Sequence, residues 1–145
     1  MSALQLLHLS AVMFWIGCVA TEIIVEQYGG RHPRWKLAVP DLHRMIDRWV
    51  EIPAFVTVLI TGALLFDHQR FLTEGLYQLK ISAGLAAVFA NLFCLYPVRQ
   101  RYLATEAGQE QSARRYGHWI DASALLGMPF GAIALGIGIY WLLQH

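Results

Sequence analysis

Charged residues are scarce in this chain of 145 residues: Lys, Arg, Asp and Glu together make up 14% of it, whereas a soluble domain usually has about a quarter. Only two cysteines are present, which excludes the disulfide framework of small secreted domains. The net charge is +1 and no run of Lys and Arg could follow a phosphate backbone, so we expect no nucleic-acid partner. Apolar residues are abundant instead, at 57% of the chain, which excludes a disordered protein. At about 20 residues per transmembrane helix, they suffice for four crossings of a lipid bilayer.

The charges cluster, and four stretches contain none of them: 1–21, 52–66, 81–98 and 122–145. The pattern predicts an all-α fold, an integral membrane four-helix antiparallel bundle that forms one domain over 1–145. The expected helices are about 3–27, 41–67, 76–98 and 115–143. Asp41 is the expected N-cap of the second helix, and Pro97 is expected near the end of the third. The alternative, a soluble four-helix bundle, needs a polar stripe on every helix, and 85–95 has none.

The basic residues predict the orientation in the membrane. Nine of them fall on the side of the first and third connections: Arg31, Arg34, Lys36, Arg44, Arg48, Arg99, Arg101, Arg114 and Arg115. Only Arg70 and Lys80 fall on the opposite side. Because Lys and Arg accumulate on the cytoplasmic side, we expect an inner-membrane protein with both termini in the periplasm.

Two further patterns concern how the helices meet each other and the lipid. Gly127 and Gly131 form a small-residue strip on the last helix, which allows close packing either within the chain or in a homodimer. The tryptophans, Trp15 among them, lie mostly near expected helix ends, as residues of an interfacial aromatic belt do.

Ionisable residues at membrane depth are the candidates for function, because an unpaired one costs several kcal/mol there. His8 and Lys80 lie on the side of the termini. His8 can bind a metal or haem iron or relay protons, or it can simply bond to a neighbouring helix. Lys80 is close enough to the boundary for its side chain to extend to water, which is the structural alternative to a catalytic role.

A denser polar layer is expected on the cytoplasmic side. His43, Asp47 and Glu51 recur every fourth residue and share one helix face, just ahead of Pro53, which can bend the helix around a cofactor. The other members of the layer are Glu22, Glu26, His118 and Asp121. Imidazole and carboxylate together are ligands for zinc, iron or manganese, and helix bundles assemble such sites from facing helices.

Two other interpretations of this layer stay open. His43 and His118 belong to different helices at similar depth and could clamp a haem from both faces. Alternatively, Arg44 with Asp47 and Arg48 with Glu51 could neutralise each other at i, i+3 spacing without any ligand. The cysteines Cys18 and Cys94 and the methionines are scattered along the sequence, which argues against copper(I) and indicates packing roles.

Parts of the sequence resemble known families. His8, followed by Trp15 and Gly17, resembles the first helix of the HemJ-type membrane protoporphyrinogen oxidases and of the copper-resistance D (CopD-like) proteins. Two more segments are similar to the oxidase family's second and third helices: Pro53-Ala54 with 57–65, and 77–81 with its lysine. The resemblance implies a haem b bound by His8, with Lys80 as a catalytic partner that contacts porphyrin propionates or substrate. It also implies oxidation of protoporphyrinogen IX, with electrons passed towards the quinone pool.

Three functions are therefore expected, in this order. The first is a haem b oxidoreductase, protoporphyrinogen oxidase-like or transferring electrons to the quinone pool, with His8 and Lys80 at its centre. The second is a membrane protein that binds or transports copper or a divalent metal through the layer of histidines and carboxylates. The third is an accessory subunit whose polar residues pair with a larger membrane partner.

Overall fold

The computed structural model describes residues 2–29 and 32–144. Most of these residues are helical, and none of them forms a strand. Arg31, one of the basic residues used for orientation, lies outside the described residues. Three helices are long and apolar enough to cross a membrane. They are α1 (Ala3–Gly29), α5 (Gly75–Glu106) and α6 (Glu110–Gln144). The chain is therefore all-α, with the length and composition of a membrane protein.

The second expected helix forms as one helical run in three parts. α2 (Ala38–Ile46) continues into a π-helical segment, η2 (Asp47–Glu51), and then into α3 (Ile52–Leu64). The Ile52 N–H bonds to the Asp47 carbonyl, five residues back, which is the π-helical pattern. Pro53 follows within the run and has no N–H to donate, so the widened turn lies where the α-helical ladder is already weakened. Two short elements complete the chain: η1 (Pro33–Trp35) and α4 (His68–Thr73).

Several expected helix ends were wrong. α5 does not end near Pro97 but passes through it to Glu106; Pro97 is fully buried, and α5 as a whole packs extensively against α6. α6 then begins at Glu110 rather than near 115. The reversal between them is short because Gly108 has a φ of +70°, which a glycine adopts without strain, and the Gln109 N–H caps the Ala104 carbonyl. Asp41 is not an N-cap; it lies inside α2 and pairs with Arg44 at 2.8 Å.

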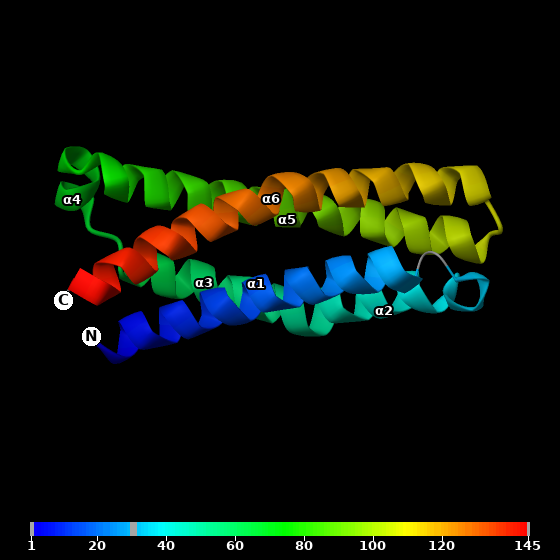
Figure 1. Cartoon of the computed structure of the whole chain (residues 1–145), viewed down its shortest axis with the longest axis horizontal. Helices are drawn as coiled ribbons and strands as arrows, with labels where there is room; N and C mark the ends of the chain where they lie inside the picture. Colours follow the sequence, from blue (N-terminus) through cyan, green and yellow to red (C-terminus); the bar gives the residue numbers. More distant parts are fainter. Residues whose placement is uncertain (1, 30–31, 145) are drawn as a thin grey trace.

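The long helical segments lie lengthwise beside one another (Figure 1). α1 packs along the α2–η2–α3 run, while α5 packs along α6, and the two pairs face each other. α1 begins and α6 ends at the same end of the molecule, beside α4; we call this the terminal end. The connections that precede α2 and α6 lie at the opposite end, which we call the loop end.

The distribution of polarity is the reverse of that in a soluble protein. Large apolar side chains point outward, including Phe89, Leu125 and Leu143, which are 69%, 77% and 81% exposed. Carboxylates are buried instead, and Glu51 is only 2% exposed. A soluble bundle with such a surface would aggregate, whereas lipid solvates it without cost. This pattern supports a membrane protein over the soluble alternative.

A small apolar core closes the middle of the molecule. Trp15 and Phe55, whose ring centroids are 6.3 Å apart, pack with Ala54, Ala87 and Val88. Trp15 is 5% exposed, so its assignment to an interfacial belt was wrong. Its position is set by a buried hydrogen bond to Glu51, described below.

The small-residue strip of α6 faces other helices of the same chain. A Cβ atom added at Gly127 would lie 3.1 Å from the Ala90 side chain of α5, and one at Gly131 would lie 3.7 Å from Ile16 of α1. The absence of side chains thus permits close helix packing within the chain.

Candidate metal centre

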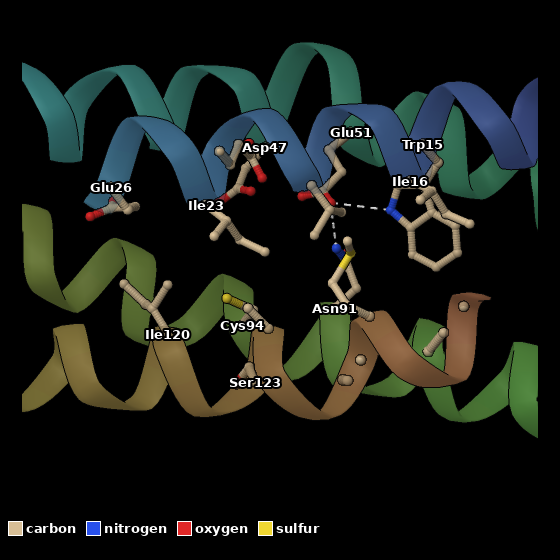
Figure 2. Close-up of a pocket in the computed structure, with 18 of the residues that line it drawn as sticks. Trp15, Ile16, Ile23, Glu26, Asp47, Glu51, Asn91, Cys94, Ile120 and Ser123 are labelled. Carbon is tan, nitrogen blue, oxygen red and sulfur yellow. Dashed lines mark hydrogen bonds between the residues drawn. The ribbon is translucent and has the colours of Figure 1, made fainter. Parts of the chain in front are cut away.

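Two helical elements supply most of the polar interior. On α1, Glu22 and Glu26 are four residues apart and share one face, and that face lies against the α2–η2 run. On that run, Asp47 and Glu51 point into the space between the α1 pair and the α5 pair (Figure 2), and His43 lines the same cavity. Glu22, His43 and Asp47 are 5%, 5% and 6% exposed. The helices thus place four carboxylates and one imidazole inside the protein.

The π-helical segment helps to align the three residues of the run. In an α-helix, residue i+4 overshoots the starting direction by about 40°. From His43 to Asp47 the chain makes this α-helical step. From Asp47 to Glu51 it passes through the wider π turn, which rotates Glu51 back towards the direction in which His43 points. All three side chains are therefore buried on one side of the run.

His43 is the centre of the cluster, and its two ring nitrogens have different surroundings. Nδ1 lies 2.7 Å from Oε1 of Glu26, a hydrogen bond that fixes the ring. Nε2 lies 3.7 Å from Oε2 of Glu22 and 3.8 Å from Oδ1 of Asp47, too far for a good hydrogen bond to either. With Nδ1–H donating to Glu26, the lone pair of Nε2 points towards two carboxylates.

This spacing suits a metal ion. The ligand atoms of Glu22, His43 and Asp47 all lie within 4.8 Å of one another. Two ligands at about 2.0–2.2 Å from one tetrahedral metal are themselves about 3.4 Å apart, so a shift of a few tenths of an ångström would complete the site. A metal-bound histidine also commonly donates its other N–H to a carboxylate. The carboxylate of Glu26 is in position to accept such a bond from Nδ1 of His43.

Glu26 has a second partner, Arg101 of α5, whose guanidinium bonds to Oε2 of the same carboxylate. The carboxylate therefore connects a cationic residue on one side with His43 on the other. Both side chains are largely buried, and the pair holds α1 against α5 near the loop end.

Glu51 lies within hydrogen-bond reach of the Asp47 carboxyl and has no cationic partner among the described residues. Its Oε1 accepts a hydrogen bond from Nε1 of Trp15 at 3.1 Å and another from Nδ2 of Asn91 at 2.6 Å. In the described part of the chain, no Lys or Arg lies within ion-pair distance of Glu22, Asp47 or Glu51. Buried carboxyl groups are normally paired, bound to a metal or protonated, so three without a cationic partner offer a place for a bound cation.

Two buried acceptors also lack a hydrogen-bond partner: Oε1 of Glu22 and Oδ1 of Asn91. Both residues line a cavity of about 70 Å³, together with His43, Asp47 and Glu51. A water needs only about 10–15 Å³, so this space is large enough for an ion with several waters. Pockets for drug-sized ligands measure about 300–1,000 Å³, well above it. Its size favours a small cation over a porphyrin.

The structure does not bring His118 to His43. His118 is exposed on α6 and lines a separate hollow with Phe93 and Trp119. Asp121, one turn further on, is also exposed, although it lies at the edge of the cavity of His43. The cluster therefore forms from α1, α2 and η2, with α6 contributing wall rather than ligands.

The expected pairing of Arg44 with Asp47 and of Arg48 with Glu51 was wrong. Arg44 pairs with Asp41 and lies 4.4 Å from the centroid of the Tyr102 ring, and the Arg48 guanidinium lies over Trp49. The two acidic residues face inward, while these arginines face other partners. The two pairings on which the ligand-free interpretation depended are therefore absent from the described residues.

At the terminal end, the structure keeps His8 and Lys80 apart from the cluster. Nδ1 of His8 lies 2.8 Å from the Thr61 hydroxyl of α3, and the ring edge packs against Gly62, where an added Cβ would lie 3.3 Å from Cε1. Lys80 is half-buried, with its Nζ 5.7 Å from the centroid of the Trp141 ring. These residues lie far along α1 and α5 from Glu22 and Asn91.

Sequence reasoning missed three residues of the site: Trp15, Asn91 and Arg101. Asn91 had a detectable signal, since it is a strongly polar residue within the charge-free stretch 81–98. Arg101 was considered only as one of the basic residues that predict the orientation in the membrane. Cys94 and Met128, which look scattered in the sequence, both line the cavity.

Comparisons with known proteins give this chain no relative. No family model, no curated protein and no solved structure matches it.

Proposed function

We propose that this chain is a multi-pass membrane protein that binds a divalent transition-metal ion in its interior, through Glu22, His43 and Asp47. The α2–η2–α3 run serves as the fourth crossing, so that the long helices form an antiparallel four-helix bundle in the inner membrane. The excess of basic residues at the loop end supports a cytoplasmic location for that end, with both termini in the periplasm.

The observation that carries the proposal is the orientation of His43. Its Nδ1 is engaged by Glu26, which leaves Nε2 to face the two carboxylates of Glu22 and Asp47 at ligand-like distances. At these distances Nε2 makes no good hydrogen bond to either carboxylate, so it is available to bind a metal ion. One imidazole with two or three carboxylates suits manganese, iron or zinc in the divalent state.

The test is metal binding by the purified protein in a mild detergent. We expect close to one tightly bound divalent ion per chain by elemental analysis, or on titration of the metal-stripped protein with Mn²⁺. His43→Gln should abolish metal binding. His118→Gln, the matched control at an exposed position of α6, should leave metal binding intact. Binding that is equal in the two variants, or absent from the unaltered protein, would refute the proposal.

A second candidate function rests on His8. Its Nδ1 is held by Thr61, which leaves Nε2 as the nitrogen that could bind haem iron, as the resemblance to the HemJ-type oxidases implies. We propose this haem-linked electron transfer as the alternative. A reduced-minus-oxidised absorbance spectrum of the purified protein should then show a b-type Soret band that His8→Ala removes. A colourless protein with stoichiometric metal would exclude it.

A further inference from the structure

The proposed divalent ion leaves one buried negative charge without compensation. Glu22, Asp47 and Glu51 carry three negative charges if ionised, and Glu26 is already paired with Arg101. A divalent ion offsets two of the three. The remainder falls on Glu51, which is 2% exposed, accepts hydrogen bonds from Trp15 and Asn91, and lies beside the Asp47 carboxyl.

One unpartnered acceptor belongs to Asn91, which bonds to Glu51, and the other belongs to Glu22, which lines the same cavity. The amide orientation of Asn91 is fixed by chemistry, because only Nδ2 can lie 2.6 Å from a carboxylate oxygen, and Oδ1 must then turn elsewhere. Oδ1 is buried and has no partner. Oε1 of Glu22 is equally without a partner, on a side chain that is more than nine-tenths buried and lines the same cavity.

We infer that the cavity holds a second cation, a monovalent alkali ion such as Na⁺, bound by Glu51, Oδ1 of Asn91 and Oε1 of Glu22; this inference rests on the proposed divalent site. The ligands are all oxygens, which hard cations prefer, whereas the first site has the imidazole. Glu22 has one oxygen towards His43 and a second oxygen free, so one carboxylate serves both ions. The charges of the two ions and the three carboxylates then sum to zero.

The location fits such an ion. Glu51 is at the end of η2, near the middle of its helical run, and the apolar core of Phe55 and Val88 closes the space beyond it towards the terminal end. Interrupted helices near the bilayer midplane are where membrane proteins commonly bind coupling cations. An alkali ion here makes divalent binding dependent on the surrounding salt.

The test is the affinity for Mn²⁺ at fixed pH and ionic strength, measured by electron paramagnetic resonance of free Mn²⁺ in NaCl, in KCl, or in N-methyl-D-glucamine chloride. The coupling between two bound ligands is typically about 5- to 150-fold. We expect at least about a fivefold tighter Mn²⁺ affinity in one of the alkali salts than in the organic salt. Glu51→Gln, which preserves acceptors for Trp15 and Asn91, should remove this dependence, as should Asn91→Leu.

The outcomes separate the two proposals. Glu106→Gln, on an exposed residue at the end of α5, is the matched control and should keep the salt effect. Equal Mn²⁺ affinity in all three salts, or an alkali effect that persists in both cavity variants, overturns the alkali site while the divalent site stands. Loss of Mn²⁺ binding in every salt from the unaltered protein overturns both.

Discussion

The two ends of this molecule treat a membrane-embedded histidine in different ways. At the loop end, His43 is buried, with carboxylates from α1 and η2 around both ring nitrogens and an arginine beyond one of them. At the terminal end, His8 is half-buried and has one recorded side-chain partner, the neutral hydroxyl of Thr61. The first arrangement concentrates negative charge, and the second satisfies a neutral ring.

His43 lies in a cluster of ionisable groups, whereas His8 makes a neutral contact between two helices. A neutral imidazole bonded to a hydroxyl is stable in an apolar surrounding and needs no ion. Three buried carboxylates without a cationic partner are costly, since each buried ion loses several kcal/mol of hydration. Cation binding is therefore expected at His43, and substitutions at the two ends should have unequal effects.

The largest effect on folding is expected at the loop end, from Arg101→Leu. The change leaves Glu26 buried without its cationic partner, and breaking a buried ion pair in this way costs about 3–5 kcal/mol. The free energy of unfolding, from SDS titration in mixed micelles, should fall by that amount. The double variant Arg101→Leu with Glu26→Gln should recover much of the loss, since no unpaired charge remains. Arg99→Leu, at an exposed position, is the control; an equal loss there would contradict the prediction.

A smaller effect is expected from Glu26→Gln on metal affinity. Glutamine can still accept the hydrogen bond from Nδ1 of His43 but lacks the negative charge that makes the ring a stronger ligand. Changes to such supporting groups typically lower metal affinity by about 10- to 100-fold. Mn²⁺ titration of the stripped protein measures this directly. Glu74→Gln, on an exposed residue at the terminal end, should have no effect. If Glu26→Gln and the unaltered protein bound Mn²⁺ with equal affinity, Glu26 would not support a metal ligand.

At the terminal end, Thr61→Val should have a milder effect. The valine keeps the shape of the buried threonine but removes the partner of His8, at a cost of about 1 kcal/mol in the free energy of unfolding. Mn²⁺ binding should be unchanged, because Thr61 does not line the cavity of His43. Loss of Mn²⁺ affinity in this variant would mean that the two ends are coupled, and the comparison drawn above would fail.

Much of the fold was predictable because lipid imposes simple rules on sequence. Charge-free stretches located α1, α5 and α6, and the count of basic residues separated the loop end from the terminal end. Pro97 misled the assignment of the end of α5, because a proline inside a helix is tolerated when its burial outweighs one lost hydrogen bond. The π-helical segment was not predictable, although Pro53 marked where the run would depart from an α-helix.

The site was predictable within each helix and much less so between helices. Spacing of four residues grouped His43, Asp47 and Glu51, and Glu22 with Glu26, as the structure has them. Spacing could not determine the rotation of α6 about its own axis, which turns His118 and Asp121 outward. Nor could it show that Asn91 and Trp15 reach Glu51, because contacts between distant segments depend on the relative register of the packed helices.

The smallest effect is expected from Cys94→Ser, and it decides which class of metal the cavity prefers. Cys94 and Met128 line the cavity, yet the carboxylates and His43 provide the grouped ligand atoms. With nitrogen and oxygen ligands alone, the Co²⁺-loaded protein shows only weak visible absorption, and its affinity for Mn²⁺ does not depend on the thiol. We therefore expect identical Co²⁺ spectra and Mn²⁺ affinities before and after the substitution.

An intense near-ultraviolet thiolate-to-cobalt band in the unaltered protein, lost in Cys94→Ser, would instead place sulfur in the coordination sphere. The loop end would then be a site for softer metals, with His43 and Cys94 as its principal ligands.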